Sequence, residues 1–204
     1  MKNYLAQNSK MKKSGAVNFG IPAFRSKEGF KTCPKAGQCA KGCYAMQKTY
    51  TWPQVKAAYE KRLALTRSPE FVETIDKEIK RRKIKKVRVH DSGDFYSKEY
   101  LTNWLLIASY NPDTLFYAYT KQVRMVKGTS LPPNFKIIFS FGGKEDKLID
   151  MSQDRHSRVF ANESQLKVFG YANASVNDDV ALGDNPRIGL IYHGAKAKQW
   201  GESA

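Results

Sequence analysis

The chain alternates between short apolar runs, typical of strands, and longer stretches whose apolar residues recur at helical spacing. The apolar runs predict strands at residues 16–21, 86–90, 115–119, 135–140, 158–161, 168–172 and 188–192. Helical patterns lie between several of them, over residues 53–63, 69–79, 97–110, 122–126 and 144–151. Strands that alternate with helices predict an α/β fold with a mainly parallel sheet.

The number of strands decides between an open sheet and a barrel. Six or seven strands are too few for the closed eight-stranded barrel, and right-handed crossovers favour a sheet that curls in one direction. We therefore expect a partial (β/α) barrel whose active face lies beyond the carboxyl ends of the strands. The length of 204 residues suits a single domain. It divides into a basic segment with the first strand (1–32), a loop (33–43) and the βα units (44–204).

Three cysteines, Cys33, Cys39 and Cys43, lie in that loop, and the chain contains no other. An odd number in one short segment is typical of a metal or redox site and not of a disulfide framework. Five residues separate the first pair and three the second, which is wide for one zinc ion but suits a cluster whose irons occupy separate corners. We expect a [4Fe-4S] cluster with one iron that has no cysteine ligand. Zinc with His90, His193 or water as fourth ligand, and free structural thiols, are the alternatives.

Basic residues flank these cysteines. Lys31, Lys35 and Lys41 carry charge that would offset thiolates, and we expect them to lower the cysteine pKa values.

A three-cysteine loop directly after a first strand, ahead of a βα partial barrel, resembles the radical S-adenosylmethionine (radical SAM) superfamily. That resemblance implies that the open iron chelates the amino and carboxylate groups of SAM, and that reduction cleaves SAM. The spacing of the cysteines is wider than is usual in the superfamily. The chain also resembles a group of small bacteriophage proteins of unassigned activity, which carry a similar loop and a downstream His-Asp-Ser-Gly-Asp motif. This second resemblance implies the host cytoplasm as location.

That motif spans His90 to Asp94 and follows a predicted strand. Ligands bind beyond strand ends in α/β folds, so His90, Asp91 and Asp94 are candidate catalytic residues. The candidate ligand-binding residues are Asp91, Ser92, Gly93, Asp94, Lys121, Ser140, Gly142 and Gly143. The alternative is that Ser-Gly-Asp only turns the chain and caps the next helix.

A formal charge of +16 favours anionic partners. We expect a small anionic ligand or SAM, with a nucleic acid or an acidic redox partner as further possibilities. No signal peptide or apolar run long enough for a membrane span is present, so we expect a cytoplasmic protein. Two other functions fit the same residues. One is a nucleic-acid-binding protein stabilised by a cluster or zinc, and the other is an enzyme that handles sulfur at the open iron.

Overall fold

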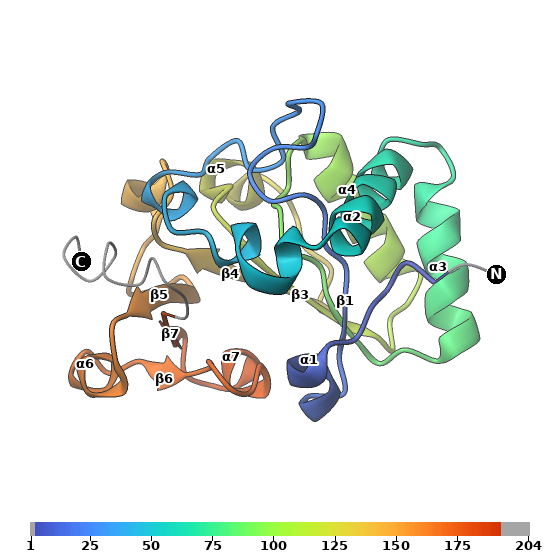
Figure 1. Ribbon diagram of the computed structural model, residues 1–204. Helices are drawn as coiled ribbons and strands as arrows, with labels where there is room; N and C mark the ends of the chain where they lie inside the picture. Colours follow the sequence, from blue (N-terminus) through green and yellow to red (C-terminus); the bar gives the residue numbers. More distant parts are fainter. Residues whose placement is uncertain (1–2, 193–204) are drawn as a thin grey trace.

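The structure is a computed structural model that describes residues 3–192, without the side chains of residues 9 and 10. In this part of the chain seven strands form one sheet in the order β1-β2-β3-β4-β5-β7-β6, and every neighbouring pair is parallel. The strands are β1 (Val17–Asn18), β2 (Lys86–Arg88), β3 (Leu115–Thr120), β4 (Phe135–Ser140), β5 (His156–Phe160), β6 (Ala172–Asn173) and β7 (Arg187–Ile191). The sheet curls into a half-barrel (Figure 1). The predicted α/β fold, partial barrel and parallel sheet are confirmed.

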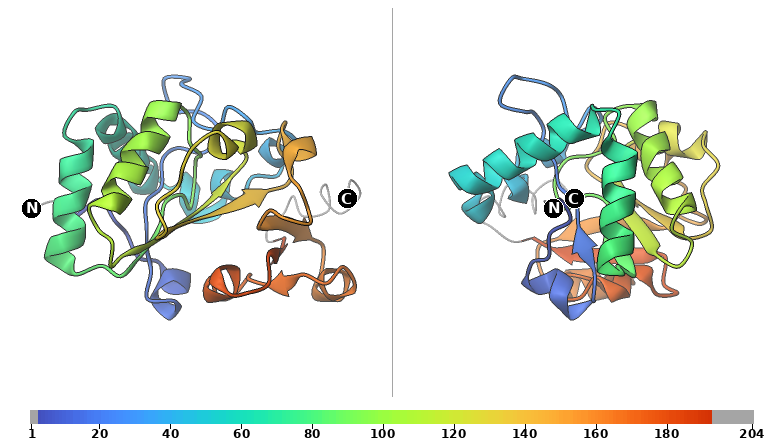
Figure 2. Two further views of the ribbon diagram at one scale, coloured as in Figure 1. Left: turned by 180° about the vertical axis from the view of Figure 1, so that it is seen from behind. Right: turned by 90° about the vertical axis from the view of Figure 1, so that its right-hand side faces the viewer.

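The helices are α1 (Ser9–Lys13), α2 (Pro53–Thr66), α3 (Phe71–Arg82), α4 (Lys98–Ser109), α5 (Val123–Lys127), α6 (Glu163–Val168) and α7 (Asp179–Leu182). Short 3-10 turns are η1 (Gln38–Ala40), η2 (Tyr44–Met46), η3 (Lys48–Thr51) and η4 (Asp146–Leu148). Helices α3 and α4 lie side by side on the outer face of the sheet (Figure 2). No helix among residues 3–192 is long and apolar enough to cross a membrane.

Helix α4 shows why these segments are helical. The Ser97 side chain accepts a hydrogen bond from the backbone N–H of Tyr100 (3.1 Å) and so caps the first turn. Tyr100, Leu101 and Trp104 then recur at helical spacing, and all three are buried in the main hydrophobic core.

Successive residues of the central strands face opposite sides of the sheet. On β3, Phe116 and Ala118 pack in the core beneath the outer helices, whereas Tyr117 belongs to a separate apolar cluster on the concave side. Met11 of α1 and Ala181 of α7 join that concave cluster, and the two helices lie next to each other below the sheet in Figure 1. They fill the concave side near the strand starts, which leaves the strand ends free for a cavity.

Several predicted elements differ from the structure. The strands expected at residues 16–21 and 86–90 are shorter, at Val17–Asn18 and Lys86–Arg88. Residues 144–151 form only the turn η4, because the Asp146 carboxylate accepts hydrogen bonds from the backbone N–H groups of Gly142 and Gly143 (both 2.8 Å) and bends the chain back. A strand is expected at residues 168–172, but the observed strand β6 begins only at Ala172 and ends at Asn173. Val168 instead ends α6, a helix that the Asn162 side chain caps by accepting from the N–H of Gln165 (2.9 Å).

Candidate cofactor and ligand site

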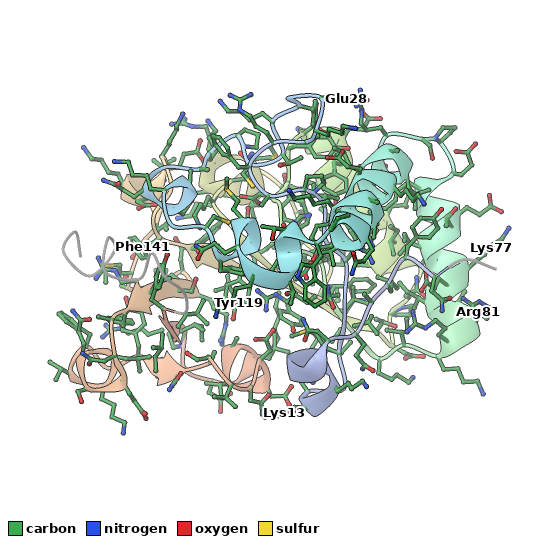
Figure 3. All side chains as sticks on the ribbon, viewed as in Figure 1. Lys13, Glu28, Lys77, Arg81, Tyr119 and Phe141 are labelled. Atoms are coloured by element: carbon green, nitrogen blue, oxygen red, sulfur yellow. The ribbon has the colours of Figure 1, made fainter. Side chains whose placement is uncertain are left out.

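A cavity of about 370 Å³ opens on the concave side, at the carboxyl ends of the strands. Its walls come from the cysteine loop, from the motif after β2, and from strand-end residues that include Tyr119, Ser140, Val159 and Leu190. Tyr119 lies between the 3-10 turns that follow the cysteine loop and helix α7 (Figure 3). The cavity therefore lies where the sequence predicts the active face.

All three cysteines line this cavity, carry free thiols and are partly exposed. Their loop is bound to the end of β4 through backbone groups. The N–H groups of Gly37 and Cys39 both donate to the carbonyl of Gly142 (3.2 and 3.1 Å). A Cβ on Gly37 would lie 3.0 Å from that carbonyl oxygen, so the close approach favours glycine. The loop is thus anchored to the sheet by backbone bonds that do not involve its thiols.

The motif after β2 is bound directly to the same loop. The backbone N–H of Asp94 donates to the carbonyl of Thr32 (3.1 Å), the residue that precedes Cys33. The Thr32 hydroxyl in turn donates to the carbonyl of Pro22 (2.6 Å). The two constellations found in the sequence therefore line one cavity.

The thiols lie close enough to influence one another electrostatically. Burial raises the pKa of Cys33 to about 12, and the charges of Asp94 and Cys43 add to the rise, while Lys121 opposes it. Burial also raises the pKa of Cys43, again with a contribution from a neighbouring thiol, that of Cys39. Backbone hydrogen bonds act in the opposite direction, from Phe24 to Cys33 and from Ala45 and Met46 to Cys43.

The expectation that Lys31, Lys35 and Lys41 lower the cysteine pKa values is wrong for Cys33 and Cys43. Lys35 forms an ion pair with Glu145 (2.8 Å). Lys31 and Lys41 are exposed to solvent, where their charge is screened.

His90 is a buried residue in an aromatic environment. Its Nε2 lies 3.1 Å from the hydroxyl of Tyr100, and the Phe95 ring packs edge-on against the imidazole at 4.7 Å. Burial lowers the pKa of His90 to about 3, so the ring is neutral at physiological pH. Within residues 3–192 no three His, Cys, Asp or Glu side chains are arranged to hold a metal ion. His193, the other histidine considered for zinc, lies outside the described residues.

Asp91 is held by three tyrosines, which we call the tyrosine clamp: Tyr44, Tyr50 and Tyr59. The hydroxyls of Tyr59 and Tyr50 approach Asp91 Oδ2 (3.0 and 3.5 Å), and the Tyr44 hydroxyl donates to the Asp91 backbone carbonyl. A Cβ on Gly20 would lie 2.1 Å from Asp91 Oδ1, so only glycine fits there. The sequence does not predict the clamp, because nothing in the spacing of these tyrosines distinguishes them from other aromatic residues.

Asp94 orders the end of β3. Its Oδ1 accepts from the hydroxyl of Thr120 (2.6 Å) and the N–H of Phe95 (2.8 Å), and its Oδ2 accepts from the N–H of Lys121 (3.0 Å). Burial raises the pKa of Asp94, while the bonds from Thr120 and Lys121 oppose the rise. With its oxygens engaged in this way, Asp94 positions Lys121 beside the cysteines.

Lys121 and Ser140 form one polar wall of the cavity, because the Lys121 ammonium donates to the Ser140 hydroxyl (2.8 Å). Ser92 also lines the cavity, and its buried hydroxyl has no partner in the described part of the chain. Gly93 has φ +85°, and a Cβ there would lie 2.2 Å from Ile21 Cγ1. Gly142 and Gly143 contact the cysteine loop through their backbone, since Gly142 accepts from the loop and Gly143 forms a β-bridge with Ala36.

The floor of the cavity contains an ion pair that the sequence does not predict. Arg88 pairs with Asp178 (2.9 Å), which also accepts from the Tyr117 hydroxyl (2.8 Å), and the guanidinium lies 4.8 Å from the centre of the Tyr119 ring. The partners are ninety residues apart in sequence. Their pairing binds the segment before α7 to β2.

Residues 2–204 match the family described as Gene product 88. The chain belongs to the Gene product 88 family. A relative, the Gene 88 protein of Mycobacterium phage L5, is 33% identical over 118 residues, which cover 52% of this chain and 48% of the relative. The chain therefore spans about half the length of the curated relative it matches, and no solved structure matches it.

Membership of the Gene product 88 family confirms the expected likeness to bacteriophage proteins. The likeness to radical SAM proteins stays a prediction, as do the roles of the individual site residues.

Proposed function

We propose that this Gene product 88 protein holds a [4Fe-4S] cluster through Cys33, Cys39 and Cys43, with one iron left open to a small ligand in the cavity. One observation carries the proposal. The three cysteines of the chain come from one loop, and all three line the same cavity at the carboxyl ends of a curled parallel sheet. Iron–sulfur clusters are bound by cysteine thiolates, and three of them leave one iron of a four-iron cluster without a protein ligand.

The three thiols are not already grouped as metal ligands in the described residues, but the backbone groups around them suit a cluster. Backbone hydrogen bonds reach Cys33 from Phe24 and Cys43 from Ala45 and Met46, and hydrogen bonds to cluster sulfurs tune these centres. The high pKa of Cys33 describes the free thiol. Metal binding deprotonates a coordinating thiol outright, and it releases a proton as it does so.

The cavity wall also fits a ligand that carries both an amino and a carboxylate group, as SAM does. The Lys121 ammonium, held by Ser140, suits a carboxylate. Ser92 Oγ belongs to a residue of the cavity wall and has no partner among the described residues, and it suits an ammonium. Bound here, the reduced cluster would supply one electron to a ligand on its open iron.

The test is anaerobic purification and reconstitution, followed by quantitation of iron, sulfide and zinc. We expect about four irons per chain and a visible absorption band that disappears in a Cys33→Ser, Cys39→Ser, Cys43→Ser variant. We also expect SAM to change the electron paramagnetic resonance spectrum of the reduced protein and to yield deoxyadenosine.

Lys121→Met is the matched ligand-site variant, since it should keep its iron and lose the response to SAM. A chain that takes up one zinc and no iron would overturn the cluster. Normal iron content without any response to SAM would retain the cluster and remove SAM as its ligand.

A further inference from the structure

The segment from Gly29 to Tyr59 contains no Asp or Glu, although it contains five lysines. Four of them, Lys31, Lys41, Lys48 and Lys56, are exposed and form no ion pair within the described residues. This segment includes the cysteine loop and the turns η1 to η3, and it passes in front of the sheet in Figure 1. We call the part between Lys41 and Lys56 the basic strap.

The strap differs from helix α3, where three basic residues are neutralised on the helix itself, because Lys77 pairs with Glu73, Lys80 with Asp76 and Arg82 with Glu78. Beyond the end of that helix, Lys83 and Lys85 are exposed and form no ion pair within the described residues, but no exposed aromatic side chain lies between them. The strap has no such partners. An anionic polymer would therefore meet unpaired positive charge at the strap.

Large apolar groups are exposed between the lysines of the strap. Trp52 is 53% exposed, and Tyr44 and Met46 are each 49% exposed. The Tyr44 hydroxyl points inward to Asp91, so this side chain is fixed while much of it remains open to solvent. Fixed aromatic groups interleaved with lysines are how proteins bind single-stranded nucleic acid, since bases stack on the aromatics and phosphates meet the cations.

The inner side of the strap adjoins two cavities. Tyr44 and Tyr50 line the cavity of the cysteines, and Tyr50 and Gln54 line a second cavity of about 360 Å³. A buried acceptor among the residues that line the second cavity, Asn18 Oδ1, has no partner in the described part of the chain. An N–H group of a base would satisfy it, and bases are accessible in this way only when they are unstacked.

We propose that the basic strap binds single-stranded nucleic acid and presents it to the second cavity, which shares Tyr50 and Asp91 with the cavity of the cysteines. This deepens the proposed function by naming its substrate class, and rests on that function only for the chemistry that follows binding. Lys41, Lys48 and Lys56 contact phosphates, Trp52 stacks on a base, and one base enters the second cavity.

The test measures binding of fluorescent single-stranded oligonucleotides by anisotropy at several salt concentrations. Each lysine that neutralises a phosphate of a single strand contributes about 0.7 to the slope of log affinity against log salt. The Lys41→Ala, Lys48→Ala, Lys56→Ala variant should therefore flatten the slope by about 2. The matched control, Lys13→Ala, Lys83→Ala, Lys85→Ala, removes the same charge from exposed lysines near the strand starts. It should keep the slope.

A second pair of variants separates stacking from charge. Trp52→Ala should weaken binding by about 5- to 150-fold, the range for one lost base–aromatic stack, while Trp52→Phe retains most of the affinity. Both leave the charge unchanged.

Three results would overturn the inference. The first is an equal loss of affinity in the two triple-lysine variants, and the second is tighter binding of duplex than of single strands. The third is that heparin competes as well as an unlabelled single strand while Trp52→Ala leaves the affinity unchanged. Iron content and visible absorption, measured on the same samples, report the cluster independently. A protein with normal iron content that does not bind oligonucleotides would refute only the nucleic-acid proposal. A protein that binds oligonucleotides but contains no iron would refute only the cluster.

Discussion

Replacing Asp178 by Asn removes the anion that neutralises Arg88 in the floor of the cavity. The Asp178 side chain is fully buried and that of Arg88 is 12% exposed, so the remaining guanidinium has little access to water. Burial disfavours its charge, but Asp178 and nearby tyrosines outweigh that effect and hold the pKa of Arg88 well above its ordinary value. Arginine does not lose its proton in proteins. The variant must therefore fold with a buried charge that has lost its counter-ion.

Breaking a buried ion pair in this way costs about 3–5 kcal/mol. Asparagine has nearly the same shape and can still accept from the Tyr117 hydroxyl, which places the expected loss near the lower limit, about 3 kcal/mol. For a chain of this size the midpoint of thermal unfolding should fall by about 6–12 °C.

The assay is urea unfolding of the metal-free protein, followed by circular dichroism. Asp179→Asn is the matched control, because its partner Lys86 and Asp179 itself are partly exposed (23% and 45%), and such pairs contribute about 0–1 kcal/mol. The double variant Arg88→Met, Asp178→Leu should recover most of the loss, since an apolar pair can replace a buried ion pair. A loss below about 1 kcal/mol for Asp178→Asn, or a double variant less stable than the single one, would refute the reasoning.

Three further changes test the support of the site. Tyr59→Phe removes a hydroxyl 3.0 Å from the Asp91 carboxylate and should lower the unfolding free energy in urea by about 1.5–3 kcal/mol. Gly189→Ala places a Cβ 2.3 Å from Leu166 Cδ1, which should cost about 1–3 kcal/mol and be partly relieved by Leu166→Ala. The pKa of His90 is about 3 in the fold against an ordinary 6.5. Its neutral form therefore adds stability that is complete above pH 6.5 and falls, by up to about 1.4 kcal/mol per pH unit, as the pH drops towards 3. His90→Gln should remove this slope.

Each of these has an outcome that contradicts it. Equal urea midpoints for Tyr59→Phe and the parent would mean that the hydroxyl does not support Asp91. A Gly189→Ala variant as stable as the parent would mean that Leu166 moves without cost. An unchanged pH dependence in His90→Gln would assign the acid sensitivity to other groups.

The sequence could predict the fold because the pattern that marks each element is local. Residues 115–119 show the apolar run of a strand, and the structure has β3 there with Phe116 and Tyr117 on opposite faces. The failures have equally local causes. Residues 144–151 have a helical pattern, but Asp146 bonds to the backbone of the preceding glycines and only a turn forms. After β5, the Asn162 side chain caps the start of α6, and the apolar residues of this segment do not predict that helix.

The site was predictable only where its residues are neighbours in the chain or lie at strand ends. The cysteines, Asp94 and Lys121 all satisfy that condition, and the structure brings them to one cavity. Arg88 and Asp178 do not, because no pattern connects a strand residue with a carboxylate ninety positions later. Glu145, the acidic partner of Lys35, is even more distant in sequence. Because the sequence does not reveal this ion pair, it could not show that Lys35 is neutralised by another residue.

The way the cysteine loop is held separates two roles that a metal centre can have. In small zinc domains the metal supplies the folding free energy, and removing a ligand unfolds the chain. Here the loop is anchored through backbone bonds from Gly37 and Cys39 to Gly142, and through Asp94 to Thr32. None of these bonds uses a thiol, so serine at the three positions preserves every one of them. A serine variant that folds like the parent but binds no iron would therefore show that the proposed metal serves the chemistry of the site and not the stability of the fold.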